Sequence, residues 1–363
     1  MRFQKGRSHF FVACLCRVVR PSAVFAILAM AFLAAASATA NVPLQGSVDA
    51  SSFGWNAEDA TACLQAAIDS GAPRVVIDRQ AGDWIVEPVT LRRSNQEVVI
   101  ADGVTVRAKR GAFKRKYGDS LFTIPTGATN VTLRGEGTAV LAMNKRDYRN
   151  TDEYVRSESR HCIAICGATN VAVRALTILS SGGDGVCVGT GARHVRLDRL
   201  VCRDHHRQGI SVIGAADMLV TNCSFDDTEG TAPMCGVDLE PGKPWNLLEN
   251  IVFEDCTFSG NANSGIKVHL NYMDETSRPV SVTFRRCVSR GNGRYGIKVT
   301  CIRPWGRAVR GKVTFEECTT ADNGAPAVFM TKVRSPQLDV VFRNCSLDAK
   351  GWASLVKIVK VDI

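Results

Sequence analysis

Beyond its first forty residues, the chain has no apolar run long enough to cross a bilayer. This absence excludes a multi-pass membrane protein. The 14 cysteines include no Cys-x-x-Cys pair, which argues against metal binding by the cysteines. The segments between the repeats described below also lack the periodicity of amphipathic helices. Leucine-rich-repeat and doubly wound folds, in which helices alternate with strands, are therefore excluded.

The first forty residues have the composition of a secretory signal peptide. A leader with five basic and no acidic residues precedes an apolar run from Ala23 to Ala36, and the small residues Ala38-Thr39-Ala40 follow. Signal peptidase recognises this pattern. We predict a signal peptide at residues 1–40, one domain over residues 41–363, and a secreted, periplasmic or extracellular location. An uncleaved anchor is the alternative, and it also leaves the remainder outside the cytoplasm.

The charge balance favours an acidic partner. The chain carries 45 Lys and Arg against 35 Asp and Glu, a formal net charge of +10. Loss of the five basic leader residues lowers it to +5. A positive charge favours nucleic acid, anionic membranes or anionic polysaccharides. For an exported chain we expect a polysaccharide, with no nucleic acid and no stable membrane insertion after signal cleavage.

A seven-residue pattern recurs along the second half of the chain. It consists of Asn or Asp, an apolar residue, any residue, an apolar residue, two mostly polar residues, and Cys or Leu. Its copies read NVAVRAL from Asn170, HVRLDRL from His194, DMLVTNC from Asp217, NIVFEDC from Asn250, SVTFRRC from Ser281, KVTFEEC from Lys312 and DVVFRNC from Asp339. Such a repeat without intervening helices predicts short strands stacked in a parallel coil.

A second strand, usually opened by glycine, lies between these copies. It reads GVCV at Gly185, GISV at Gly209, GVDL at Gly236, GIKV at Gly265 and GIKV at Gly296, with looser versions AVFM at Ala327 and LVKI at Leu355. Like residues of successive turns lie about 4.8 Å apart, so Cys223 to Cys345 should form an inward column. Because disulfides need a closer Cβ approach of about 3.8 Å, we predict free, buried thiols.

The N-terminal part predicts a cap and the first turns. Asn56 and Asp59 precede a helix expected over residues 57–70, which would cover the open end of the coil. Strands are expected in VVI from Val75, WIVEPVTL from Trp84, VVIADGVTV from Val98, LFTI from Leu121 and NVTLRGEG from Asn130.

Several segments resemble a known superfamily. DATACLQAAIDSGAPRVVI and NVTLRGEG resemble the entry to pectate-lyase-superfamily β-helices, and SGGDGVCVGTG with HHRQGISVIG is similar to the polygalacturonase signature. The resemblance covers residues 42–363 and implies an all-β, right-handed parallel β-helix with a short N-terminal capping helix. Polygalacturonases carry adjacent aspartates where this chain has Asp184-Gly185, and a histidine where it has Gln208. Two catalytic positions therefore differ.

The outward residues of the Gly-led strands predict a functional site. One outward column reads Cys187, Ser211, Asp238, Lys267 and Lys298, and the next reads Gly189, Ile213, Glu240, His269 and Thr300. Neighbouring rungs should bring Asp238 beside Lys267 and Glu240 beside His269. We take these four as candidate catalytic residues. The candidate substrate-binding residues are Arg207, His205, His206, Ser211 and Lys298, with Tyr148 and Arg149 from the charged insertion at residues 144–160.

Two reactions suit this set. In β-elimination on a uronic-acid polymer, Lys267 or His269 would be the base, and Arg207 or a Ca²⁺ ion held by Asp238 and Glu240 would neutralise the substrate carboxylate. In glycoside hydrolysis, Asp238 and Glu240 would act as a carboxylate pair. We favour elimination because lysines flank the acids. A uronate epimerase and a non-catalytic glycan-binding surface protein remain alternatives, and in the last case the pairs only keep an exposed sheet soluble.

Overall fold

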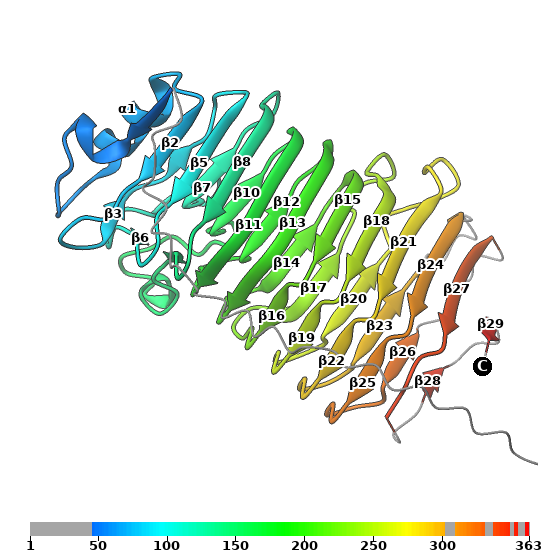
Figure 1. Cartoon of the computed structure of the whole chain (residues 1–363). Helices are drawn as coiled ribbons and strands as arrows, with labels where there is room; N and C mark the ends of the chain where they lie inside the picture. The colour runs from blue at the N-terminus through cyan, green and yellow to red at the C-terminus, as the bar shows by residue number, and fades with distance from the viewer. Residues whose placement is uncertain (1–45, 302–308, 331–336, 349–351, 355–359, 363) are drawn as a thin grey trace, which may run out of the picture. The chain divides into compact units, whose positions relative to one another are not determined.

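The strands stack as a parallel coil whose turns follow one another along its axis (Figure 1). The computed structural model describes residues 46–301, 309–330, 337–348, 352–354 and 360–362. The predicted signal peptide lies outside these residues, as does the LVKI strand expected at Leu355. Every strand pair formed by the described residues is parallel, as the repeat predicts.

Each turn of the coil contributes to three walls. The first wall contains β1 (Ser47–Asp49), β2 (Arg74–Ile77), β5 (Gln96–Ile100), β8 (Thr129–Gly135), β11 (Thr169–Leu179), β13 (Ala192–Arg203), β15 (Ala215–Thr221), β18 (Leu248–Glu254), β21 (Val280–Arg285), β24 (Gly311–Glu316), β27 (Leu338–Arg343) and β29 (Lys360–Asp362). The second contains β3 (Trp84–Val86), β6 (Thr105–Ala108), β9 (Val140–Ala142), parts of β11 and β13, β16 (Ser224–Asp226), β19 (Thr257–Ser259), β22 (Val288–Arg290) and β25 (Thr319–Ala321).

The Gly-led strands form the third wall. Its members are β4 (Val89–Thr90), β7 (Phe122–Ile124), β10 (Ile163–Ile165), β12 (Val186–Val188), β14 (Gln208–Val212), β17 (Cys235–Leu239), β20 (Ile266–His269), β23 (Ile297–Thr300), β26 (Val328–Met330) and β28 (Trp352–Ser354). Glycine opens many of these strands because successive backbones come close there. A Cβ on Gly209 would lie 2.7 Å from the carbonyl oxygen of Gly236.

Part of the core consists of ladders of identical side chains. The fourth position of the repeat places Phe253, Phe284, Phe315 and Phe342 in one buried column, and neighbouring rings stack with centroids 4.7–5.2 Å apart. The predicted cysteine column is confirmed. The cysteines of the described residues are all free thiols, and Cys287 Sγ donates to the carbonyl oxygen of Phe253 at 3.5 Å.

The polar first position of the repeat has a conformational cause. Asn130, Asn170, Asp217 and Asn250 have φ values of 54–55°, in the left-handed region that Asn and Asp tolerate better than most residues. The chain turns a corner of the coil at each of them. The left-handed conformation thus explains Asn or Asp in the earlier copies of the repeat, whereas Asp339 of the last copy lies in a regular strand pairing.

A buried asparagine ladder was not predicted. Asn261, Asn292 and Asn323 are at most 1% exposed and follow the ends of β19, β22 and β25. The Nδ2 of Asn261 donates to Oδ1 of Asn292 at 2.9 Å, and Asn292 bonds Asn323 in the same way. Each side-chain amide therefore has a hydrogen-bond partner in the next turn of the coil, as a buried polar group requires.

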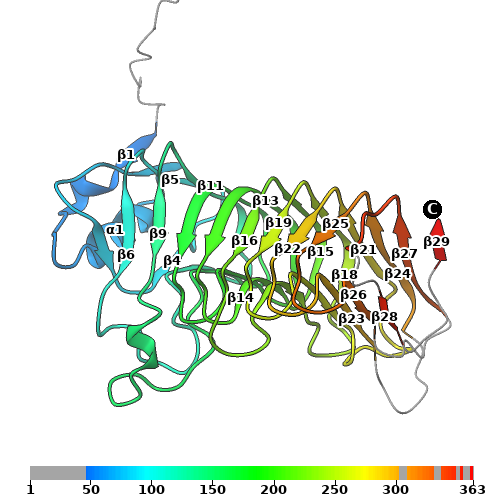
Figure 2. The same cartoon turned by 90° about the horizontal axis from the view of Figure 1, so that it is seen from below.

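The N-terminal helix is shorter than expected. Helix α1 spans Thr61–Asp69 rather than residues 57–70, and it lies beside the first turns at the N-terminal end of the coil (Figure 2). A 3-10 helix, η1 (Ala50–Phe53), precedes it. The prediction began too early because the amide of Ala60 bonds the carbonyl oxygen of Ile85, while the Asp59 carboxylate accepts the amide of Thr61 at 3.0 Å.

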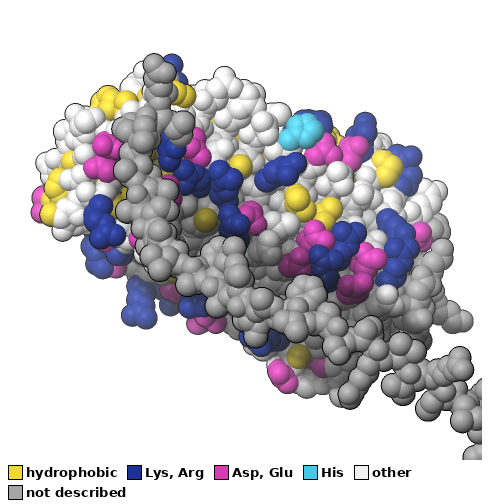
Figure 3. Space-filling model, in the orientation of Figure 1, with side chains coloured by type: hydrophobic (Ala, Val, Ile, Leu, Met, Phe, Trp, Pro, Cys, Tyr) yellow, Lys and Arg dark blue, Asp and Glu magenta, His cyan; other side chains and the backbone are white. Residues whose placement is uncertain are grey.

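The outer face of the first wall carries mixed charges. Lys, Arg, Asp and Glu side chains are interspersed on the face seen in Figure 3. Arg285, for example, pairs with Glu316 at 2.9 Å and with Glu254 at 3.4 Å on the adjacent rungs. Exposed pairs of this kind contribute little stability each. The described residues contain no helix long and apolar enough to cross a membrane.

Candidate functional site

The third wall forms the outward column that the sequence predicted. Cys187, Ser211, Asp238, Lys267 and Lys298 are in direct register on β12, β14, β17, β20 and β23. The pairing of Asp238 with Lys267 is thereby confirmed. Lys267 Nζ donates to Asp238 Oδ2 at 2.6 Å.

The carboxyl group of Asp238 is completely buried beneath the polar side chains around it. Burial raises its pKa to about 7, and the Glu240 carboxylate acts in the same direction, against the attraction of Lys267. Burial alone would lower the pKa of Lys267, but the Asp238 carboxylate raises it. Lys267 therefore stays protonated at neutral pH, beside an acid whose own pKa is raised by burial.

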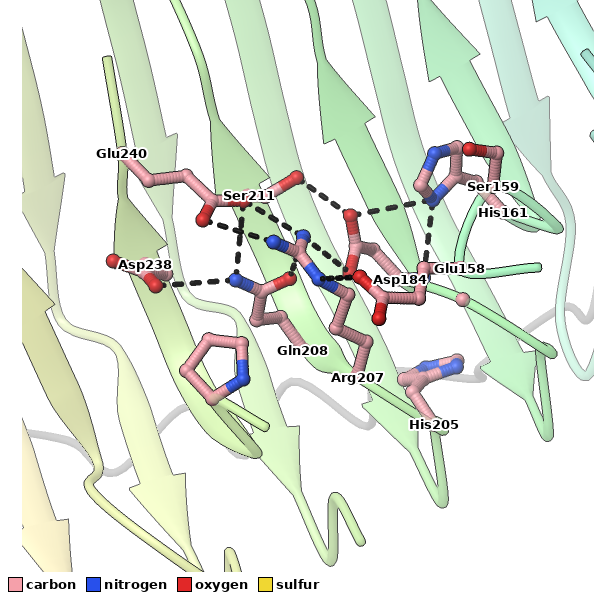
Figure 4. A network of polar contacts seen from close by, with 12 residues as sticks. Glu158, Ser159, His161, Asp184, His205, Arg207, Gln208, Ser211, Asp238 and Glu240 are labelled. Carbon is pink, nitrogen blue, oxygen red and sulfur yellow. Dashed lines mark hydrogen bonds and ion pairs between the residues drawn. The ribbon is translucent and has the colours of Figure 1, made fainter. Parts of the chain in front are cut away.

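Arg207, just before β14, links three acidic groups (Figure 4). Its guanidinium donates to both oxygens of Glu240 at 2.7 and 2.9 Å. It also lies 3.5 Å from Asp184 and 3.2 Å from Glu158. Although burial favours the neutral form, the Asp184 and Glu240 carboxylates raise the pKa of Arg207. Arg207 is therefore a fixed cation.

Gln208 connects the two acids proposed for catalysis. Its Nε2 donates to Asp238 Oδ2 at 3.2 Å and to Glu240 Oε1 at 3.3 Å. Because one nitrogen bonds both carboxyl groups, Asp238 Oδ2 and Glu240 Oε1 cannot be farther apart than the sum of the two hydrogen-bond lengths.

A second polar cluster surrounds Asp184, whose side chain is completely buried. Ser211 Oγ donates to Asp184 Oδ2 at 2.7 Å, and His161 Nδ1 lies 3.2 Å from the same oxygen (Figure 4). Burial would raise the pKa of Asp184, but His161 and Arg207 lower it. The cluster joins the Arg207 network through Asp184 itself.

A pocket, here called the Lys267 pocket, opens above the Asp238–Lys267 pair. Its lining residues are Arg207, Ile213, Ala232, Pro233, Glu240, Gly242, Lys267, His269 and Tyr272. Burial, together with Lys267 and Lys298, lowers the pKa of His269 to about 4, so its imidazole is neutral at neutral pH. Glu240 and His269 line one pocket as predicted, but the ion-pair partner of Glu240 is Arg207.

The charged insertion forms a separate pocket, here called the loop pocket. It contains the 3-10 helix η2 (Asp147–Arg149) and brings together three predicted substrate contacts, Tyr148, Arg149 and His206. The full lining is Lys145, Tyr148, Arg149, Thr151, Arg156, Ser157, Glu158, Gly182, His206 and Thr231. Burial lowers the pKa of His206, and the cations Arg149, Lys145 and Arg156 lower it further. The loop pocket therefore carries a positive potential.

Three predicted substrate contacts are wrong or displaced. His205 is completely buried, is hydrogen-bonded with Ser181 Oγ at 2.8 Å and cannot touch a substrate. Ser211 is equally buried and positions Asp184 instead. Lys298 lies outside the linings of both pockets, with its Nζ 5.7 Å from the ring centroids of Tyr295 and Phe329. The sequence shows which way a strand residue points but not what covers it.

Asp238 and Glu240 do not fit the predicted calcium site. Ca²⁺ takes six to eight oxygen ligands, whereas these carboxyl groups already bond Lys267 and Arg207. An ion would have to break both pairs.

Sequence reasoning missed His161, Glu158 and Tyr272, and it did not include Asp184 among the candidate site residues. The only signal for Asp184 was the polygalacturonase resemblance, which places Asp184 and Gln208 at catalytic positions. The structure brings both into the Arg207 network.

Comparisons with known proteins agree with the fold. Residues 140–304 match the family model described as "right handed beta helix region". Polygalacturonase from Erwinia carotovora ssp. carotovora is 13% identical with a TM-score of 0.62, over 87% of this chain and 96% of that one. The surface adhesin PfbA of Streptococcus pneumoniae is also 13% identical with a TM-score of 0.62, over 82% and 78%.

A phage protein shares the same architecture over part of its length. The enzymatically active domain of tailspike protein 2 from bacteriophage CBA120 is 12% identical with a TM-score of 0.63, and this chain covers 47% of it. No curated protein sequence matches the chain. The chain therefore has the fold of a right-handed parallel β-helix.

Proposed function

We propose that this protein is an exported, carbohydrate-active β-helix protein that cleaves a uronic-acid-containing polysaccharide by β-elimination. One observation carries the proposal. The Lys267 pocket is lined both by the Lys267 ammonium, which is paired with the buried Asp238, and by the neutral imidazole of His269. The leader at residues 1–40 supports export.

Elimination needs a cation and a base on the same sugar. The Lys267 ammonium, kept protonated by Asp238, would neutralise the uronate carboxylate. His269 would remove the proton from the carbon beside that carboxylate. The bond from the next carbon to the glycosidic oxygen then breaks, a double bond forms between the two carbons, and the oxygen leaves with a proton from solvent. An entering carboxylate raises the pKa of His269 from about 4 toward the range of an effective base.

The sequence left open whether Lys267 or His269 is the base and which cation neutralises the substrate; the contacts in the structure favour one assignment. Lys267 is the poorer base because its proton is held by Asp238 at 2.6 Å. Arg207 is the poorer substrate cation because both of its terminal nitrogens already donate to Glu240. His269 and Lys267 therefore take the base and cation roles, and Arg207 orders the network between the two pockets.

The loop pocket supports a polymeric substrate. Its Arg149 and Arg156 are cations in a concavity separate from the Lys267 pocket, and Arg207 links the two through Glu158 and Glu240. A chain with repeated carboxylates would meet positive potential at both places. A single sugar acid would use only one of them.

Hydrolysis is the second candidate, because the pKa of Asp238 is raised to about 7, as in a general acid, and Gln208 holds Glu240 beside it. Hydrolysis would require Asp238, now buried, to become accessible. Elimination requires no such change.

The test is an activity screen on alginate, pectate and glycosaminoglycans. The unsaturated product of elimination absorbs in the ultraviolet, so a rising absorbance supports the proposal. Release of reducing sugar without that absorbance indicates hydrolysis, and binding without any product indicates a glycan-binding protein. His269→Ala should abolish the absorbance change, with Lys243→Ala, an exposed residue outside the pocket lining, as the control.

A further inference from the structure

We propose that His161, Asp184 and Cys187 form a binding site for a divalent transition metal of the zinc type. Their ligand atoms, one nitrogen, one carboxylate oxygen and one sulfur, all lie within 4.8 Å of one another. The ligands of a tetrahedral zinc ion, with bonds of about 2.0–2.3 Å, are about 3.3–3.8 Å apart. Small side-chain adjustments would bring the three atoms to that spacing.

The backbone holds the three residues in place. Asp184 precedes β12 and Cys187 lies within it, while His161 leads into β10 on the adjacent rung. The carbonyl oxygens of Asp184 and Gly185 accept the amides of Cys162 and Ile163, both at 3.0 Å. Ala164 is in register with Cys187. A rigid parallel ladder therefore fixes the spacing of the three metal ligands. This favours ion binding, because the side chains lose little conformational entropy when the ion binds.

The carboxylate of Asp184 has unused acceptor capacity. It is completely buried, and its Oδ1 accepts no hydrogen bond in the structure. The nearest cation to that oxygen is Arg207 Nη1, at the long distance of 3.5 Å. The other oxygen is oriented by Ser211 Oγ at 2.7 Å, a contact of the kind that positions metal ligands. The carboxylate can therefore accept a further partner, and its Oδ2 is the oxygen that lies beside His161, at 3.2 Å.

The donor set selects the class of metal. Calcium and magnesium take oxygen ligands almost exclusively, whereas imidazole and thiolate favour zinc and its neighbours in the transition series. Three protein ligands leave a fourth position for water or substrate, as in catalytic zinc sites. The lack of a Cys-x-x-Cys pair argued against metal binding at the level of sequence, but a site assembled from two rungs of a coil needs no such pair. The His161 side chain is 13% exposed and would give the ion a way in.

Without an ion, His161 Nδ1 accepts the amide of Asp184 at 3.1 Å when neutral, and pairs with Asp184 Oδ2 at 3.2 Å when protonated. The metal proposal and this alternative differ in one measurable property. A metal site binds Zn²⁺ or Co²⁺ with one-to-one stoichiometry through Cys187, whereas the ion pair binds neither.

The experiment titrates chelator-treated, dialysed protein with Zn²⁺ by calorimetry and with Co²⁺ by absorption spectroscopy. We expect one ion per chain at micromolar affinity or tighter, a thiolate-to-cobalt absorption band, and a higher melting temperature with Zn²⁺. Cys187→Ser should remove the band, and His161→Ala should weaken binding at least 100-fold. Ser211→Ala should weaken it by about 10–100-fold. Cys301→Ser, which alters a buried thiol on another rung, should bind as the unaltered chain does.

Two outcomes would overturn the proposal. One is the absence of Zn²⁺ and Co²⁺ binding by the unaltered protein at micromolar concentration. The other is an unchanged cobalt band in Cys187→Ser. Because the first is measured on the unaltered chain, it does not depend on whether a variant folds.

Discussion

Lys267 Nζ lies 2.6 Å from Asp238 Oδ2 across two rungs of the third wall, with the acid completely buried and the ammonium at the edge of a pocket. The buried acid thus fixes both the position and the charge of an accessible cation. This arrangement underlies the chemistry proposed for the site.

Removal of Asp238 should affect stability as well as activity. Asp238→Ala leaves the Lys267 ammonium, 12% exposed, without its counterion. Breaking a buried pair in this way costs about 3 kcal/mol of unfolding free energy, measured by urea denaturation. Lys267→Met added to Asp238→Ala should recover much of that loss, because no unpaired charge then remains. A single variant as stable as the unaltered protein would contradict the buried-pair description.

His269 should give the rate an acidic limb. Its imidazole accepts a proton only while neutral, so kcat/KM, which reports the free enzyme, should fall as the pH drops toward the pKa of about 4. The fall in kcat should come at a higher pH, because the bound carboxylate raises the pKa of His269. His269→Ala should lower kcat by about 100-fold or more. His194→Asn, at an exposed corner, serves as the control. A kcat unchanged by His269→Ala would remove His269 as the base.

His269 should also make the stability of the protein depend on pH, in a direction that follows from its lowered pKa. The unfolded chain protonates His269 near its ordinary pKa of about 6.5, whereas the folded protein does so only near pH 4. Unfolding therefore takes up a proton between these values, and stability contributed by this group falls as the pH drops from 6.5 toward 4. Urea denaturation at pH 7 and pH 5 should show a smaller pH dependence for His269→Ala than for the unaltered chain.

The loop pocket should affect substrate affinity more than turnover. Arg149→Ala removes a cation from the pocket lining and should raise KM several-fold while leaving kcat nearly unchanged. Arg146→Ala removes an exposed cation outside that lining and is the matched control. Equal effects of the two variants would mean that only net charge matters and that the pocket holds no part of the substrate.

The asparagine ladder should be a stability element. Asn292→Ala removes the amide that donates to Asn323 and Phe258 and accepts from Asn261. Buried groups left without partners cost about 1–3 kcal/mol each, so we expect a loss of about 3 kcal/mol in urea denaturation. Ser281→Ala, at an exposed strand position, should change stability by less than about 0.5 kcal/mol. A similar effect of both substitutions would show that the ladder is not a stabilising element.

The sequence by itself determined the coil and the register of the site. A repeat with period-two apolar residues can bury them only if successive turns stack, so the alignment of Asp238 with Lys267 followed from the spacing alone. The cysteine column followed in the same way. A local rule failed at the start of α1, where a tertiary bond from the Ala60 amide to Ile85 intervened.

Only the tertiary structure decided which side chains cover others. The direction of a strand residue says nothing about the long side chains that fold over it, so the burial of Asp238, Ser211 and His205 was not visible in the sequence. Arg207 reaches Glu240 and Asp184 from a turn, and its choice of partner depends on side-chain conformation rather than on the repeat. Asp184, His161 and Cys187 likewise become neighbours only when two rungs and a turn are placed together.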